Sequence, residues 1–153
     1  MSISAMDDTS DSLQKVFKRT ATESLSPTRS DRILVVDDDE KICYFVNIIL
    51  THGGYSVATA LSGRKALALY RQALAAGKPF DAVILDLTIP DDIGGVEALN
   101  KFLAIDPFVK AIISSGYADD PVMVNAADYG FKGSITKPFI AKTLWKVVKE
   151  VLK

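Results

Sequence analysis

The sequence has very little cysteine or histidine, the residues that most often build metal cages and nucleophilic triads. Cys43 is the only cysteine and His52 the only histidine among 153 residues. A single cysteine excludes a disulfide within the chain and a cysteine-based metal cage. His52 has no nucleophile and acid in view, so triad chemistry is not expected. We expect Cys43 to be a packed thiol and His52 to lie at a helix end, where an imidazole suits the helix dipole.

Long apolar runs and an excess of one charge are also missing. No run approaches the roughly 20 apolar residues that span a bilayer. The N-terminus does not have the basic-then-apolar order of a signal peptide. The formal net charge of −1 gives no general electrostatic reason to expect nucleic acid or an anionic membrane as a partner. We therefore expect a cytoplasmic protein with no membrane segment and no direct contact with nucleic acid.

Residues 1–30 differ in composition from the rest of the chain. They are rich in Ser, Thr and Asp and poor in β-branched apolar residues. We interpret them as an N-terminal tail or linker that is disordered. The alternative is a short helix, because Leu13, Val16 and Phe17 are spaced as one apolar stripe.

From residue 31 onward, strand-like and helical patterns alternate. The strand-like runs are 32–36, 55–59, 81–85, 109–114 and 133–136. The helical stripes lie at about 42–50, 66–74, 95–105, 119–129 and from 140 to the end. Parallel neighbours need crossover connections, so this alternation predicts a parallel sheet covered on both faces. The predicted fold class is α/β: a doubly wound, five-stranded parallel sheet in the flavodoxin-like order 2-1-3-4-5, with five helices.

Acidic side chains follow two of the predicted strands. Asp37 and Asp38 leave the carboxyl end of the first strand, and Asp86 leaves that of the third. In the order 2-1-3-4-5 these two strand ends lie side by side at the switch point, where ligands bind. Three carboxylates left alone there would repel one another and take up protons. A divalent cation removes the conflict, and an all-oxygen ligand set suits Mg²⁺.

The last two predicted strands add a hydroxyl, an amide and an ammonium to the same edge. Ser115 and Gly116 follow the fourth strand, and Lys137 follows the fifth. A carboxylate nucleophile, a cation, a hydroxyl and a lysine are together what phosphoryl transfer requires. The residues themselves therefore predict a phosphoryl-transfer site.

Four segments resemble the landmark segments of a response-regulator receiver domain, in order and at the right spacing. They are "ILVVDDDE", "VILDLTIPDDIGG", "IISSGYAD" and "TKPF", and the resemblance covers about 31–153. It implies that Asp86 is the phosphoacceptor, supplied by a phosphohistidine donor. It also implies that Asp38 binds Mg²⁺ directly and that Asp37 holds a metal-bound water. Thr88 is implied to give its backbone carbonyl to the metal.

The resemblance also implies a switch. Ser115 lies where the family has a Ser or Thr that moves towards the phosphoryl oxygen. Lys137 resembles the invariant lysine, and its bond to Pro138 is expected to be cis. Phosphorylation is then expected to alter the face made by the helix at 119–129, the strand at 133–136 and the last helix. The implied partners are a histidine kinase or phosphotransfer protein, or a second copy bound through that face.

Three positions depart from the commoner pattern. Ser134 stands where the family often has an aromatic residue, which argues against an aromatic switch behind Ser115. Tyr117 is expected instead to lie over the acylphosphate and slow its hydrolysis. An extra glycine in "DDIGGVEAL" predicts a differently shaped loop after Asp86. Similar loops and the "SSGY" string occur in receivers attached to hybrid histidine kinases.

Other interpretations of the acidic pocket are weighed against this one. An aspartyl-phosphate phosphatase would need a second aspartate two positions after the nucleophile, where this chain has Thr88. A flavin binder would want a hydroxyl-rich phosphate loop where this chain has Asp37 and Asp38. A receiver-like interaction domain that is never phosphorylated is disfavoured because every reactive position is filled. The remaining alternative is that Asp37, Asp38 and Asp86 are ordinary surface carboxylates that bind no ligand.

Several conspicuous residues have structural explanations. Asp39 and Glu40 suit a helix N-terminus, where the helix dipole favours negative charge. Asp91 and Asp92 are expected to form a solvated turn after Pro90. Two further aromatic residues, Phe139 and Trp145, are expected to pack against the domain rather than to bind a ligand.

Overall fold

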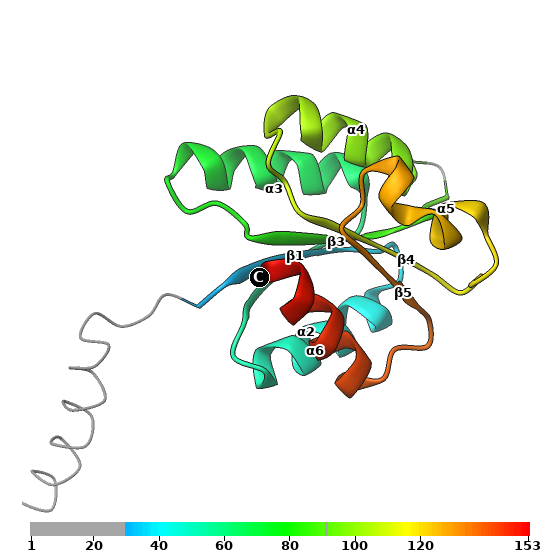
Figure 1. The fold of residues 1–153 in the computed structure, drawn as a ribbon. Coiled ribbons are helices and arrows are strands. Elements are labelled where there is room, and N and C mark those ends of the chain that lie inside the picture. The colour runs from blue at the N-terminus through cyan, green and yellow to red at the C-terminus, as the bar shows by residue number, and fades with distance from the viewer. Residues whose placement is uncertain (1–29, 91) are drawn as a thin grey trace, which may run out of the picture. The chain divides into compact units, whose positions relative to one another are not determined.

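The computed structural model describes residues 30–90 and 92–153. Its centre is a parallel sheet in the order β2-β1-β3-β4-β5 (Figure 1). The strands are β1 (Arg32–Val36), β2 (Ser56–Ala60), β3 (Ala82–Asp86), β4 (Ala111–Ser115) and β5 (Gly133–Thr136). The predicted fold class and strand order are confirmed. Three strands, β2, β3 and β4, end one residue later than predicted, so that Asp86 and Ser115 are themselves the last residues of β3 and β4.

Helices cover both faces of the sheet. They are α2 (Glu40–His52), α3 (Gly63–Ala75), α4 (Gly95–Ile105), α5 (Pro121–Val124) and α6 (Ala141–Leu152), with a 3₁₀ turn η2 (Ala126–Tyr129). In Figure 1, α3 and α4 lie above the sheet, and α2 and α6 lie below it. Within the described residues, no helix is long and apolar enough to cross a membrane.

The core consists of two apolar clusters, one on each face of the sheet. Leu34 and Val36 of β1 belong to the cluster under α3 and α4, whereas Ile33 and Val35 belong to the one over α2 and α6. All four side chains are buried, because successive residues of a strand point to opposite faces. A strand buried on both faces has no polar side, which explains the continuous apolar run before Asp37.

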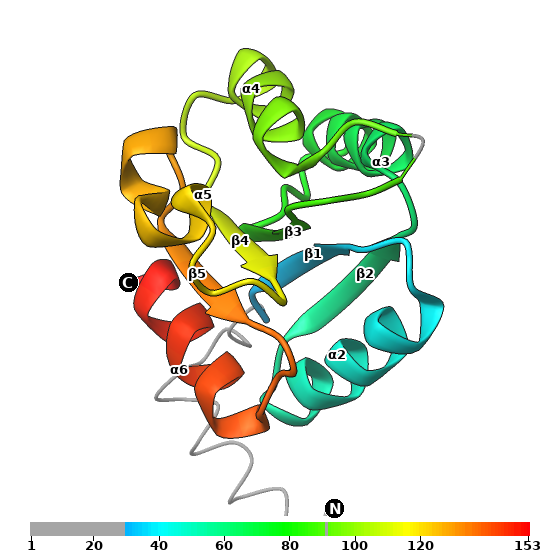
Figure 2. The same cartoon turned by 90° about the vertical axis from the view of Figure 1, so that its right-hand side faces the viewer.

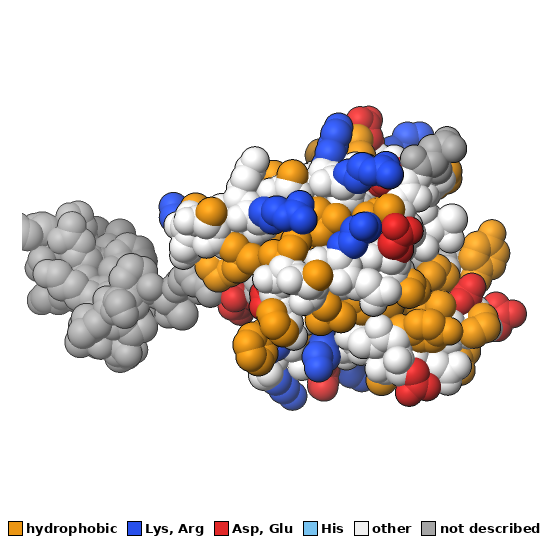
Figure 3. Space-filling model, turned by 90° about the horizontal axis from the view of Figure 1, so that it is seen from above, with side chains coloured by type: hydrophobic (Ala, Val, Ile, Leu, Met, Phe, Trp, Pro, Cys, Tyr) orange, Lys and Arg blue, Asp and Glu red, His pale blue; other side chains and the backbone are white. Residues whose placement is uncertain are grey.

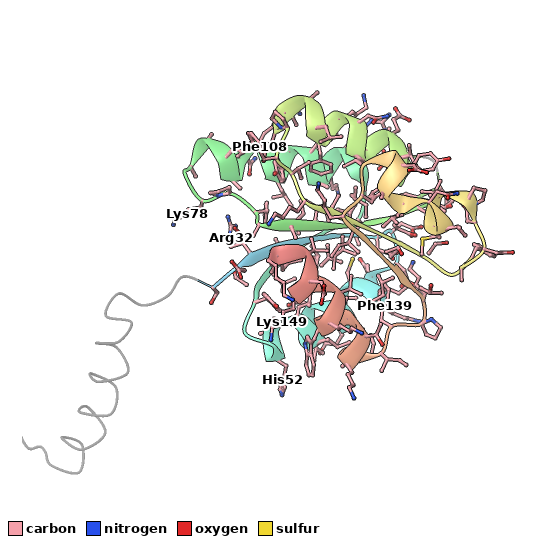
Figure 4. The ribbon with its side chains drawn as sticks, viewed as in Figure 1. Arg32, His52, Lys78, Phe108, Phe139 and Lys149 are labelled. Carbon is pink, nitrogen blue, oxygen red and sulfur yellow. The ribbon has the colours of Figure 1, made fainter. Side chains whose placement is uncertain are left out.

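Side-chain caps and glycines set the limits of α2. The Asp39 carboxylate accepts a hydrogen bond from the backbone N–H of Lys41 at 2.9 Å, and Glu40 is the first helical residue. Both acidic residues therefore belong to the helix N-terminus, as predicted. His52 is the last helical residue, and Gly54 just beyond it has φ of +95°, a conformation that glycine tolerates best. Figure 4 shows His52 at this lower end of α2.

The helix predicted over 119–129 is the main correction to the fold. Asp120 caps it and Pro121 begins it, but the α-helix α5 ends at Val124. Asn125 leaves the helical region, with φ of −116° and ψ of 39°, and the chain continues as the 3₁₀ turn η2. Gly130, with φ of +99°, then ends the segment. Local backbone geometry at Asn125 thus divides one predicted helix into two short pieces.

The predicted tail, residues 1–30, lies outside the described residues except for Ser30. Residues Asp31–Lys153 make one compact unit. Figure 2 views this unit from the side at which the strands end. The loops at this edge carry the residues discussed below.

Candidate functional site

Three carboxylates lie together at the carboxyl edge of the sheet. Val36 pairs with Leu85 across β1 and β3, so Asp37 and Asp86 leave the two strands at the same level. Asp37, Asp38 and Asp86 each offer an oxygen, and these oxygens lie within 4.8 Å of one another. Asp37 and Asp86 are buried, whereas Asp38 is exposed to solvent. The sheet thus brings together the residues that the sequence predicts to meet.

Asp37 is the most heavily bonded member of this acidic cluster. One of its carboxylate oxygens accepts from Lys137 Nζ at 2.7 Å, and the other accepts from the backbone N–H of Asp39 at 2.9 Å. Its backbone carbonyl accepts from the Cys43 thiol at 3.3 Å. Contacts with Lys137 and with the start of α2 therefore fix Asp37, while Asp38 is exposed to solvent.

Lys137 joins two of the carboxylates. Its Nζ lies 2.7 Å from Asp37 and 3.3 Å from Asp86, and the lysine side chain is only 20% exposed. Burial alone would lower the pKa of Lys137, but the hydrogen bond and charge of Asp37, together with Asp86, outweigh it and raise that pKa. The ammonium therefore stays charged and offsets part of the repulsion between the two acids.

Asp86 sits in an environment that opposes its ionisation. Burial, and then the negative charge of Asp37, raise the pKa of Asp86 above its usual value. Lys137 and the backbone hydrogen bond from Thr88 act in the opposite direction but do not cancel the rise. A carboxylate held in this way gains from a cation or from covalent modification that neutralises its charge.

The fourth strand supplies a buried hydroxyl to the same edge. Ser115 is 3% exposed, and its Oγ accepts from the backbone N–H of Tyr117 at 3.0 Å. Its carbonyl accepts from the Lys137 backbone N–H at 2.8 Å, which links the segments after β4 and β5. The Tyr117 side chain is 72% exposed, and Gly116 has open space around it. The strand thus fixes Ser115, while the two following residues are at the surface.

The remaining predicted residues lie around the cluster. The Lys137–Pro138 bond is cis, as the resemblance implies. Ser134 is half-buried on β5 and pairs with Ile113 of β4. The Thr88 side chain is exposed, and the contact that ties this residue to the site is its backbone hydrogen bond to Asp86.

The prediction for Asp92 is wrong in one part: its backbone N–H donates to Ile89 at 3.3 Å, as in a turn at Pro90, but its side chain is not solvated. Its side chain is 7% exposed, and its carboxylate accepts from the backbone N–H of Gly63 at 2.6 Å and from Arg64 at 3.0 Å. The positive end of α3 attracts this carboxylate out of solvent. Residue 91 lies outside the described residues. The sequence around Pro90 holds no signal of this contact, because its partner is 29 positions away.

The two aromatic residues pack as predicted, and Cys43 is buried. Phe139 is half-buried against the lower cluster, between α2 and α6 in Figure 4. Trp145 donates from its indole nitrogen to the carbonyl of Ile49 at 2.7 Å, which fastens α6 to α2. Cys43 is buried beneath Asp37. Its thiol contact with the Asp37 carbonyl was not anticipated from the sequence.

The donor set of the acidic cluster fits a hard divalent cation. Asp37, Asp38 and Asp86 offer carboxylate oxygens only, without sulfur or imidazole. Such ligands suit Mg²⁺ and Ca²⁺ better than zinc or copper. Because two of the carboxylates are buried and the third is exposed, a bound cation would keep one side open to water or to a second ligand.

The fold and the site together define a doubly wound α/β protein with an acidic, lysine-bridged pocket at its topological switch point. Residues 33–149 match the sequence profile of the response regulator receiver domain. The chain belongs to this family, whose members are signalling domains of two-component systems.

Individual relatives agree with this assignment. The chemotaxis protein CheY of Thermotoga maritima is 32% identical over 123 residues, which cover 80% of this chain and 98% of that protein. CheY of Treponema pallidum is 35% identical over 123 residues, which cover 80% and 83% of the two chains. The crystal structure of a CheY-like receiver domain from Methanospirillum hungatei matches with a TM-score of 0.70 and 31% identity, over 81% of this chain and 94% of the other.

Proposed function

We propose that this receiver domain takes a phosphoryl group onto Asp86 in a Mg²⁺-dependent reaction and passes the signal on through a change of conformation. The observation that carries the proposal is the position of the Lys137 ammonium, 2.7 Å from Asp37 and 3.3 Å from Asp86, in a group of three carboxylates. One buried acid is thereby held beside a fixed positive charge at an open edge of the sheet.

Asp37, Asp38 and Asp86, with the backbone carbonyl of Thr88, are the residues that would hold Mg²⁺. When bound, the ion supplies positive charge that neutralises the carboxylates and the phosphoryl oxygens. In this assignment Asp38 is the direct ligand, which agrees with its exposure, and Asp37 orients a water. Removal of Mg²⁺ should therefore abolish phosphorylation without unfolding the domain.

The reaction is an in-line displacement at phosphorus. A carboxylate oxygen of Asp86 forms the new phosphorus–oxygen bond while the bond from phosphorus to the donor's imidazole nitrogen breaks. The Lys137 ammonium lies where it can bind a phosphoryl oxygen, and it needs no proton transfer to do so. Ser115 then turns its hydroxyl from the Tyr117 amide towards the phosphoryl group.

The conformational readout is proposed for α5, β5 and α6. Lys137 directly follows β5, and its backbone is bonded to Ser115, so movement at either residue reaches this face. Val124 on α5 is 66% exposed, which leaves apolar surface for a partner or for a second copy of the chain. The proposed phosphodonor is a histidine kinase or a phosphotransfer protein in the cytoplasm. The domain catalyses the transfer of one phosphoryl group onto its own Asp86 and then slowly hydrolyses the acylphosphate. It does not turn over a separate substrate.

Incubation with Mg²⁺ and acetyl phosphate, followed by intact mass measurement, tests the proposal. We expect the mass of one phosphoryl group to be added in wild-type protein, and none in Asp86→Asn or in the presence of EDTA. Wild-type protein that stays unmodified while it folds normally and binds Mg²⁺ would contradict the proposal. Steady hydrolysis of a phosphorylated metabolite without covalent capture would instead indicate a phosphatase.

A further inference from the structure

The β3–α4 loop, residues 87–94, is fastened to a helix that takes no part in the acidic cluster. Oδ2 of Asp92 accepts from the backbone N–H of Gly63, the first residue of α3, at 2.6 Å. Oδ1 of the same carboxylate accepts from Arg64 at 3.0 Å. The Asp92 side chain is 7% exposed whereas that of Arg64 is 73% exposed. The backbone bond is therefore the stronger contact, because an exposed ion pair contributes little.

An apolar contact reinforces this bond. The Ile93 side chain is buried and covers Gly63 so closely that a Cβ placed there would lie 2.5 Å from Ile93 Cγ1. Only glycine at residue 63 lets the loop approach the start of α3 in this way. Asp92 and Ile93, neighbours in the loop, thus both contact Gly63 at the start of α3.

The surroundings favour a negative charge at this position. Figure 3 looks down on the layer of α3 and α4, where lysine and arginine side chains lie among apolar ones. Arg64, Arg71 and Lys101 line a groove between the two helices together with Glu97. The N-terminus of α3 adds the positive end of its dipole. Burial would raise the pKa of Asp92, but hydrogen bonds from the backbone of Ile93 and Gly63 and the charge of Arg64 lower it.

The β3–α4 loop that Asp92 holds against α3 begins directly after Asp86, the proposed phosphoacceptor. The Leu87 backbone N–H is bonded to Ser114 and the Leu87 carbonyl to Gly95, so both ends of the loop are closed. The Asp92 backbone N–H donates to Ile89 at 3.3 Å. Only residues 89–91 separate Thr88, whose backbone is bonded to Asp86, from Asp92. Fixing Asp92 therefore limits where the Thr88 carbonyl can point.

We infer that Asp92 is a positioning residue for the metal site: by tying the β3–α4 loop to Gly63, it holds the Thr88 carbonyl in the place from which it binds Mg²⁺. This inference rests on the proposed function. Neither Asp92 nor Gly63 is among the residues that would hold the cation or accept the phosphoryl group. Their effect is on the affinity of the site for Mg²⁺, because a free loop must be ordered when the ion binds.

Asp92→Ala tests the inference by two measurements that do not require phosphorylation. In Mg²⁺-free protein, the amide hydrogen of Gly95, which is bonded to Leu87, should exchange about tenfold faster than in wild type. In titration calorimetry, the Kd for Mg²⁺ should rise about tenfold, the size of effect typical when a supporting contact of a metal site is lost. Asp92→Asn keeps an oxygen acceptor for Gly63 and should restore most of the affinity.

Ser62→Ala is the matched control. Ser62 caps the same helix by accepting from the Lys65 backbone N–H at 3.1 Å, but it makes no contact with the loop among the described hydrogen bonds. This variant should lower the urea midpoint and leave the Kd for Mg²⁺ within about twofold of wild type. Gly63→Ala is a second, independent variant, because its methyl group displaces Ile93 and should raise the Kd while Asp92 is intact.

A Kd for Mg²⁺ in folded Asp92→Ala and Gly63→Ala that stays within about twofold of wild type would overturn the inference. An equal rise in Ser62→Ala would overturn it as well, because general destabilisation of α3 would then explain the effect. Wild-type protein that binds Mg²⁺ but gains no phosphoryl group would overturn the proposed function alone. The comparison of Kd values would still decide the role of Asp92.

Discussion

Asp86 is a buried acid with a negative neighbour and a positive one. Burial and Asp37 disfavour its charged form, and Lys137 only partly compensates. Because the pKa of Asp86 is raised in the folded state, this residue binds a proton more readily when folded than when unfolded. Protonation of Asp86 therefore adds to the free energy of unfolding at low pH. This contribution is lost as the pH rises through the pKa that Asp86 has in the folded protein.

Asp86→Asn should therefore stabilise the Mg²⁺-free protein at pH 7, because the amide needs no ionisation. Urea unfolding in EDTA, followed by Trp145 fluorescence, should show a higher midpoint for the variant. The difference should shrink as pH falls from the raised folded pKa towards the ordinary value near 4. A variant less stable than wild type at pH 7 would contradict the assigned balance of charges around Asp86.

Cys43 should be chemically silent in the folded protein. Burial, and then the charge of Asp37, raise the pKa of its thiol to about 11. At pH 8 only about one thiol in a thousand would then be ionised, and the thiolate is the reactive form. Labelling with a thiol-specific disulfide reagent should be at least about 100-fold slower in buffer than in urea. Equally fast labelling in the two conditions would show that Cys43 is open to solvent.

Individual site residues differ in how far the sequence predicts them. Asp37, Asp38 and Asp86 could be placed together because parallel strands end at one edge and the strand order follows from the topology. Lys137 follows by the same reasoning from β5. The contact of Asp92 with Gly63 could not be predicted, since it depends on how closely a loop approaches a helix that is distant in sequence.

At the scale of the element, the apolar periodicity of the sequence predicts which helices and strands exist, and in what order, better than it predicts the residues at which they end. Strands β3 and β4 run to Asp86 and Ser115 because those residues still pair with their neighbours, Asp86 with Ser114 and Ser115 with Thr136. The apolar pattern cannot show this, because both residues are polar. The break of α5 at Asn125 likewise depends on backbone geometry, which overrides the helical spacing on either side.

The start of α4 lies unusually close to β3, the strand that ends at Asp86. A Cβ at Gly95 would lie 2.8 Å from the Asp86 carbonyl oxygen and 2.7 Å from Ile113 Cδ1. Gly95→Ala should therefore cost about 1–2 kcal/mol of unfolding free energy, although alanine is the better helix former. Urea unfolding measures the loss. Gly116→Ala is the control: it meets open space and should change stability by less than about 0.5 kcal/mol.

At the scale of the whole domain, one sheet contributes side chains to two separate apolar clusters, one on each of its faces. Leu99 of α4 belongs to the cluster above the sheet and Leu144 of α6 to the one below, and both are fully buried. The alternating side chains of β1 and β3 belong to both clusters. Loss of packing in one layer should therefore weaken the other through the shared strands.

Leu99→Ala and Leu144→Ala should each cost about 2–5 kcal/mol and should each leave a single unfolding transition. Trp145 lies on α6 and its indole nitrogen donates to Ile49 of α2, so its fluorescence reports the contact between the two helices below the sheet. For Leu99→Ala, the midpoint from Trp145 fluorescence should fall as far as the midpoint from circular dichroism. Separate midpoints would mean that the two layers unfold independently.

The central place of β3 has a consequence for signalling. β3 is hydrogen-bonded to β1 on one side and to β4 on the other, and Asp86 pairs with Ser114 directly after the last pair with β1, Val36 with Leu85, so shifting the Asp86 backbone would strain the ladder with β4 and disturb the end of the ladder with β1. If Asp86 is phosphorylated as proposed, its backbone should therefore stay almost in place, and the rearrangement should occur in the loops and helices beyond the end of the sheet. Under the proposed function, the response to phosphorylation would then depend on those outer segments, which can move while the strand that carries Asp86 stays in place.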